Sequence, residues 1–122
     1  MTDSRKPQAS LVDANAFELH SSAVESPQQL GSVQTKAGFY AVGELGETEV
    51  GIWEMSAGAM KDIETDEFFV VLSGAGTVEI LPVDGFLSQR LELFPGALIR
   101  LHAGMPTEWR VTQKIRKVYL SR

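Results

Sequence analysis

Residues 67–85 of the chain read EFFVVLSGAGTVEILPVDG and decide the fold class. The run 67–72 is rich in aromatic and β-branched residues, and the run 77–83 alternates apolar with polar residues, as strands do. Ser73 to Gly76 separates the two runs, and Asp84-Gly85 is a strong signal for a hairpin turn. This stretch therefore predicts two antiparallel strands followed by a hairpin.

Similar strand patterns lie on both sides of this stretch. They cover residues 49–55, 86–93, 97–101, 108–112 and 115–120. Gly-bearing turns separate them at a spacing of roughly 8–12 residues, which is typical of an antiparallel sandwich or barrel. No long helical period interrupts the strands, so the pattern argues against a βαβ architecture.

The first 38 residues differ from the rest, because they are rich in Ser, Gln and Ala. Within them, residues 10–19 are the one periodic stretch, and Ser10 with Asp13 resembles a capping box, so we expect a short helix there. Residues 21–38 are expected to be irregular. We therefore expect an N-terminal arm over residues 1–38, packing on the barrel or on a partner chain, and a barrel over residues 39–122.

Composition narrows the function classes. The 122 residues hold 11 bases and 16 acids, for a net charge of −5, and this acidic balance predicts no nucleic-acid partner. Since there is no cysteine, disulfides, thiolate catalysis and Cys-ligated metals are excluded. The longest fully apolar run, residues 68–72, falls far short of the ~20 residues that span a bilayer. No secretory signal is apparent, and we expect no membrane association and a cytoplasmic location.

Charge is unevenly distributed along the chain. Residues 44–67 contain eight acids and one base, Lys61, whereas residues 100–122 contain six bases and one acid, Glu108. Opposite charges favour strands that lie side by side or face each other across a dimer interface, and two solvated faces would explain the same pattern.

Residues 51–119 carry a family resemblance. The matching features are Gly51-Ile52-Trp53-Glu54, Gly58, Glu67 with the apolar run to Gly74, Phe94-Pro95-Gly96, Ala103-Gly104, Trp109 and the closing run from Ile115 to Tyr119. This combination resembles the cupin superfamily, and within it the small single-domain subgroup related to ureidoglycine aminohydrolase and ethanolamine-utilisation cupins. The resemblance implies an all-β fold, an RmlC-like jelly-roll β-barrel with an irregular N-terminal arm, and a homodimer.

The metal ligands of the general cupin pattern, three histidines and one glutamate, are largely absent. Glu67 matches the glutamate, but the histidine positions fall on or near Lys61 and Ile63, and on Thr107. A lone carboxylate does not hold a transition metal, so we predict no metal and no cofactor. A divalent ion held by Glu67 and His102, with Glu64 as a further oxygen donor, is the alternative.

The same mapping predicts six side chains that point into the barrel: Lys61, Ile63, Glu67, Thr107, Trp109 and Val111. A buried carboxylate without a metal needs a proton or a counter-ion, and Lys61 can supply the positive charge. The pair Lys61–Glu67 has two interpretations: a structural ion pair, or the acid and base of a catalytic site.

The remaining candidates are substrate-binding residues. Trp53 and Trp109 either pack in the core or form pocket walls that stack on a planar or amide-bearing ligand. Thr107, Glu64 and His102, which precedes the turn at Gly104, complete the candidate set.

These residues predict a cupin-fold protein that binds a small polar or nitrogenous metabolite in the barrel without the usual metal. One alternative is a metal-independent or weakly metal-dependent enzyme that uses Glu67 and Lys61 on ureide- or amine-related substrates, a substrate class implied by the resemblance alone. The other is a non-catalytic dimeric module with a filled barrel.

Overall fold

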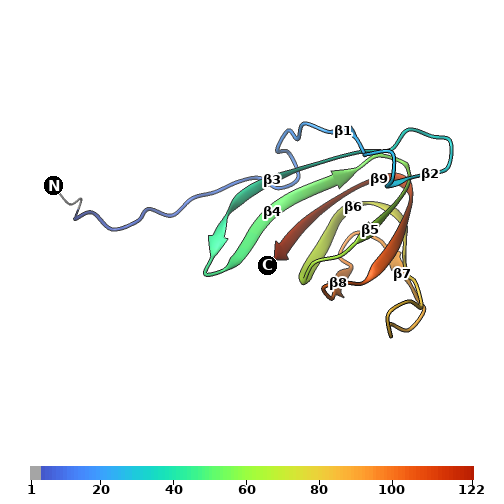
Figure 1. Ribbon diagram of the computed structural model, residues 1–122. Coiled ribbons are helices and arrows are strands. Elements are labelled where there is room, and N and C mark those ends of the chain that lie inside the picture. The colour runs from blue at the N-terminus through green and yellow to red at the C-terminus, as the bar shows by residue number, and fades with distance from the viewer. Residues whose placement is uncertain (1–3) are drawn as a thin grey trace.

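The computed structural model describes residues 4–122, and within them nine β-strands and no α-helix form one curled antiparallel sheet (Figure 1). The strands are β1 Ser22–Ala23, β2 Gln29–Leu30, β3 Lys36–Leu45, β4 Thr48–Met55, β5 Gly58–Ile63, β6 Glu67–Ile80, β7 Gln89–Leu93, β8 Leu98–Leu101 and β9 Pro106–Ser121. The sheet closes around its concave face as an incomplete barrel. The predicted all-β jelly-roll class is confirmed.

Two long strands, β6 and β9, organise the sheet. They pair with each other from Glu67↔Ser121 to Ile80↔Thr107. On its other edge, β9 pairs first with β5 and then with β4. On its other edge, β6 pairs first with β8 and then with β7. Each long strand therefore serves two partners in turn, and the sheet has to curl to bring them there.

The structure merges strands that the sequence pattern separates. Residues 73–76 form bulges within β6 rather than a turn, because the register against β9 shifts there, and Gly74 takes a φ of 100°. The predicted hairpin at Asp84-Gly85 is present between β6 and β7, with φ values of 55° and 86°. Strand β5 was not predicted, because its glycine start at Gly58 resembles a turn.

Residues 4–38 of the N-terminal arm contain no helix, so the helix expected over residues 10–19 is wrong. Instead, the Asp13 carboxylate accepts the backbone N–H groups of Asn15 at 3.0 Å and Ala16 at 3.3 Å, which closes a single turn. Leu11 is 90% exposed, so the apolar side of such a helix would have nothing to pack on, and short isolated helices are marginal in water. Residues 1–3 lie outside the described part of the chain.

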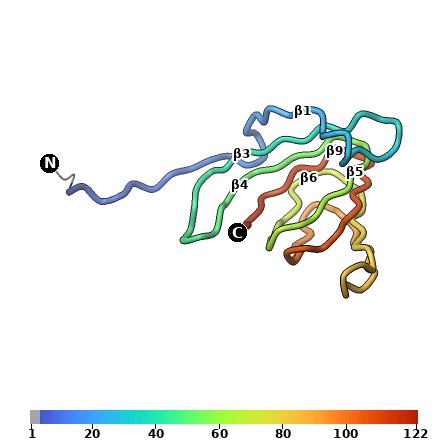
Figure 2. Tube along the Cα trace, in the orientation of Figure 1, coloured from blue at the N-terminus to red at the C-terminus, as the bar shows by residue number. Residues whose placement is uncertain are grey.

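Later parts of the arm join the sheet: β1 pairs with β3, and β2 pairs with β5. Phe17 stacks on Tyr40 of β3 at 4.5 Å between ring centroids. The Arg116 guanidinium donates to the backbone carbonyls of Ala14 at 3.1 Å and Phe17 at 2.6 Å. The described part of the arm that precedes these contacts runs away from the sheet, as Figure 2 shows. A domain boundary at residues 38/39 stays a prediction.

The acidic and basic stretches meet within the chain. Glu54 on β4 is 3% exposed and lies opposite Arg116 on β9. Its carboxylate binds the Arg116 guanidinium at 2.9 Å and the Lys114 ammonium at 3.3 Å. For these residues, the opposite charges lie side by side on adjacent strands, as one of the interpretations of the charge pattern predicted.

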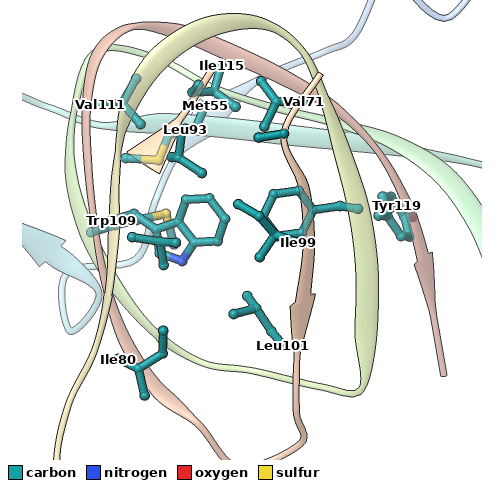
Figure 3. Close-up of a cluster of buried hydrophobic side chains, with 14 residues drawn as sticks. Met55, Val71, Ile80, Leu93, Ile99, Leu101, Trp109, Val111, Ile115 and Tyr119 are labelled. Atoms are coloured by element: carbon teal, nitrogen blue, oxygen red, sulfur yellow. The ribbon is translucent and has the colours of Figure 1, made fainter. Parts of the chain in front are cut away.

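The core fills the concave side of the sheet, as Figure 3 shows. Met55, Phe69, Leu101 and Ile115 are completely buried there. Within residues 4–122, no helix is long and apolar enough to cross a membrane. Several buried polar residues lie against this core: Glu67 pairs with Leu101 across β6 and β8, and the Lys117 ammonium lies 4.1 Å from the ring of Phe69.

Candidate functional site

A cavity of about 370 Å³ lies beside this core, and the core residues Met60, Trp109 and Tyr119 form part of its lining. Its lining combines aromatic side chains with four carboxyl groups and one ammonium group: Phe39, Trp53, Trp109, Tyr119, Glu49, Asp62, Glu64, Glu67 and Lys117 are among the residues that form it. The residues come from β3, β4, β5, β6, β9 and the bend between β5 and β6. A volume of this size matches the lower range of small-molecule sites.

Lys117 and Glu67 form an ion pair at the wall of the cavity. The Lys117 Nζ donates to Glu67 Oε1 at 2.8 Å, and the two side chains are only 5% and 9% exposed. Both residues occupy inward positions, Lys117 between the buried Ile115 and Tyr119 on β9, and Glu67 at the start of β6. Each buried charge is therefore offset by the other.

Three aromatic rings surround the same ammonium group. The Lys117 Nζ lies 4.1 Å from the ring centroid of Phe69, 4.5 Å from that of Trp53 and 4.8 Å from that of Trp109. Aromatic faces carry partial negative charge and attract cations at such distances. The barrel thus contains an ammonium group that is held by one carboxylate and three ring faces.

Glu64 is a second buried carboxyl group in the lining of the cavity. It is 8% exposed, and its Oε2 accepts the Thr107 hydroxyl at 2.6 Å and the Trp109 indole N–H at 3.1 Å. Burial raises the pKa of Glu64 above its ordinary value, against the lowering effect of these two hydrogen bonds. Burial likewise raises the pKa of Asp62. Both carboxyl groups are therefore costly to keep ionised without a counter-ion.

Tyr119 and Glu49 close the rim of the cavity. The Tyr119 hydroxyl donates to Glu49 Oε2 at 2.8 Å. Burial raises the pKa of Tyr119, and the hydrogen bond to Glu49 adds to this effect, so the phenol stays protonated and acts as a donor.

The structure does not bring Lys61 and Glu67 together, so the predicted pairing is wrong. Lys61 is exposed on β5, opposite Glu108 of β9, while Glu67 binds Lys117. On β5 the inward positions are Met60, which is 5% exposed, and Asp62, whereas Ile63 is 65% exposed. The sequence mapping was one residue out of register on this strand, and in a strand such a shift moves every side chain to the other face.

The other predicted site residues divide into two groups. Thr107, Trp109, Glu64 and Trp53 all reach the cavity or its wall. His102 lies exposed in the β8–β9 turn and is not among the residues that form the cavity. The alternative metal site is therefore not assembled, and within residues 4–122 no three His, Cys, Asp or Glu side chains are grouped so that they could hold a metal ion.

Sequence reasoning missed Lys117, Asp62 and the Tyr119–Glu49 contact. For Lys117 a signal was present, because Ile115, Lys117 and Tyr119 alternate along a strand whose other apolar positions point inward. A lysine at such a position marks either a strand edge or a buried cation. Which acid it meets depends on the pairing of β6 with β9, and the spacing of residues along the chain does not reveal that pairing.

Comparisons with known proteins support the fold. The chain is similar to the EutQ protein of Clostridium difficile, with 21% identity over 82% of this chain and 79% of that one and a TM-score of 0.59. A protein of unknown function from Pseudomonas syringae pv. tomato gives 17% identity, covering 91% of this chain and 46% of that one, with a TM-score of 0.71. A putative ethanolamine utilization protein Q of Salmonella typhimurium gives 13% identity, 85% and 93% coverage and a TM-score of 0.57.

Among curated proteins, none matches the chain significantly. A family model described as the EutQ-like cupin domain matches residues 42–119, which is more than half of the chain. This match covers β4 to β8 and most of β9 and agrees with the observed barrel, and the chain therefore belongs to the EutQ-like cupin family.

Proposed function

We propose that this cupin binds a small polar or nitrogenous metabolite in the barrel cavity, with the Lys117 ammonium as its internal cation instead of a bound metal. One observation carries the proposal: the buried Lys117–Glu67 pair lies at the wall of a cavity of about 370 Å³ that also exposes Glu64 and two tryptophans. A module with a filled barrel would have no such space.

The lining has the composition of a ligand site. Aromatic walls supply apolar contact area, and a few placed polar groups orient a bound molecule. One structure of similar fold is named as a putative ethanolamine utilization protein, and this name is compatible with a nitrogenous ligand, although its 13% identity supports only the fold. The ligand class therefore rests on the chemistry of the cavity.

The chain offers a selective readout for the test. It contains two tryptophans, Trp53 and Trp109, and both line the cavity. Their two indole N–H signals in a ¹H–¹⁵N correlation spectrum of EDTA-treated protein therefore report on the lining of this cavity. Ethanolamine, urea, glycerol and acetate, each added separately, sample four ligand chemistries. We expect at least one to shift both indole signals; unchanged signals throughout would refute the proposal.

A second candidate function is acid–base catalysis, and one observation favours it. Burial raises the pKa of Glu64 and of Asp62, and groups perturbed in this way are frequent among general acids and bases. Lys61 takes no part in such a site from its exposed position, and Glu67 would act with Lys117. Following the same compounds over time by NMR separates the two functions, since only an enzyme converts a bound ligand.

A homodimer and a cytoplasmic location complete the proposal as predictions from the sequence. The dimer is supported by exposed apolar side chains on adjacent strands of the convex face, among them Phe68 on β6 and Leu120 on β9.

A further inference from the structure

The internal cation shows which chemistry the cavity lining accepts. The Lys117 ammonium is held by the Glu67 carboxylate at 2.8 Å and by the faces of three aromatic rings within 4.8 Å. Carboxylates and aromatic faces are the groups that bind organic ammonium ions in proteins generally. The walls of this cavity are thus already shown to stabilise an ammonium group in a buried position.

A second buried carboxyl group in the same cavity, that of Glu64, forms no ion pair within the described residues. Glu64 receives hydrogen bonds only from the neutral donors Thr107 and Trp109, both on Oε2. Within residues 4–122 no ion pair involves Glu64 or its neighbour Asp62. Lys117, the cation in the described lining, favours the charged form of both groups from a distance, but its ammonium is bound to Glu67. The net charge of the lining is therefore negative, which favours a cationic ligand over a neutral or anionic one.

We propose that the cavity binds the ammonium group of a small organic amine, with Glu64 as its counter-ion and Asp62 beside it. This inference rests on the proposed function and names its ligand class. The indole N–H of Trp109 bonds to Glu64, so this ring is fixed next to the carboxylate. Trp53 lies 5.4 Å from Trp109 between ring centroids, and the two rings supply an apolar wall for the carbon chain of the amine.

Three probes of equal chain length test the charge preference: propylammonium, propan-1-ol and propionate. Each is titrated at pH 7 and constant ionic strength, and the indole signals of Trp53 and Trp109 are followed. We expect propylammonium to shift the Trp109 signal most strongly, and the other two probes to bind at least about tenfold more weakly, because a charge-assisted hydrogen bond to Glu64 is lost.

Variants identify the counter-ion. Glu64→Gln keeps the size and an acceptor for Thr107 and Trp109 but removes the charge, so we expect propylammonium affinity to fall about tenfold to a hundredfold. Asp62→Asn is expected to cause a smaller loss. Glu108→Gln is the matched control, since Glu108 faces away from the cavity and binds Arg110 at 2.9 Å; it should leave the affinity unchanged.

Several outcomes would overturn the inference. Equal or tighter binding of propan-1-ol or propionate would show that the ligand is not a cation, while binding in the cavity would stand. Propylammonium binding that survives both Glu64→Gln and Asp62→Asn would place the cation elsewhere. If none of the three probes shifted the indole signals, the inference would also be overturned. The tests with ethanolamine, urea, glycerol and acetate would then decide the proposed function separately.

Discussion

Lys117 and Glu67 face each other inside the barrel with almost no access to water. Removing one partner of such a pair leaves the other charge buried alone, and this costs about 3–5 kcal/mol. We therefore expect Lys117→Met to lower the free energy of unfolding by this amount in urea titrations.

The double variant Lys117→Met, Glu67→Gln is the control for this effect. It removes both charges, and because neither is left unpaired, we expect it to recover more than half of the lost stability. A single variant as stable as the original chain would mean that the pair is not buried as described.

Replacing Glu64 is expected to raise the free energy of unfolding, whereas replacing Lys117 is expected to lower it. Burial raises the pKa of Glu64 in the folded state above its ordinary value, so its contribution to stability is fully present below the unfolded pKa and is lost as the pH rises through the folded pKa. Glu64→Gln removes this loss. We expect the variant to be more stable than the original chain by about 0.5–2 kcal/mol at pH 7, the range of many stabilising substitutions at functional sites.

Urea titrations between pH 4 and pH 8 measure this difference. The advantage of Glu64→Gln should be small at the acid end and grow toward pH 7. An advantage that is constant with pH would argue that Glu64 does not titrate from a buried position.

At the residue level, the sequence could predict Glu67, Glu64, Thr107, Trp53 and Trp109 as members of one site. The sequence-based mapping paired Glu67 with Lys61 instead of Lys117. Alternate residues of a strand face opposite sides of the sheet, and which residues of β5 face inward depends on where that strand begins. Lys117 and Lys61 are equally suited by charge, and only the pairing of β9 between β4 and β6 decides which one is buried.

At the scale of secondary structure, the bulge in β6 depends on Gly74. Its φ is 100°, and a Cβ at this position would collide with the backbone carbonyls of Lys114 and Gln113 on β9. We expect Gly74→Ala to cost at least about 2 kcal/mol, from the left-handed backbone and from displacement of β9. Gly43→Ala is the matched control in β3, because a Cβ there meets nothing within 4 Å.

Urea titrations of both variants check this expectation. Equal stabilities for Gly74→Ala and Gly43→Ala would show that the bulge is not required by close contact between β6 and β9. Because β9 carries Lys117, we also expect Gly74→Ala to shift the Trp53 indole signal.

The strands themselves were largely predictable, since alternation and Asp84-Gly85 are local signals. The bulged run of residues 73–76 was not, because glycines favour a turn and a bulge equally and the choice is made by the partner strand. The arm failed as a helix for a related reason: apolar residues such as Leu11 predict a helix only where another surface can cover them.

For the whole molecule, the convex face of the sheet presents an apolar patch. Phe68 is 49% exposed and Leu120, its cross-strand partner, 38%, while Leu98 on the neighbouring strand is 70% exposed. Patches of this kind commonly mark protein–protein contacts. We expect a second copy of the chain to cover it, so light scattering should give the mass of a dimer.

A substitution in the patch should separate the copies. Leu98→Glu is expected to convert the dimer to a monomer, whereas Leu87→Glu, in the β6–β7 loop and 80% exposed, should not. A monomer at high concentration for the original chain would refute the dimer.

The central claim is that the cation of this barrel is the Lys117 ammonium rather than a metal ion. The most direct test is elemental analysis of protein purified without a metal-affinity tag, before and after incubation with Mn, Fe, Ni and Zn salts. We expect substoichiometric metal in every sample, because Met60, Asp62, Thr107 and the paired Glu67 do not form a transition-metal ligand set. One tightly bound ion per chain would contradict the claim and make a metal centre the leading explanation of the cavity.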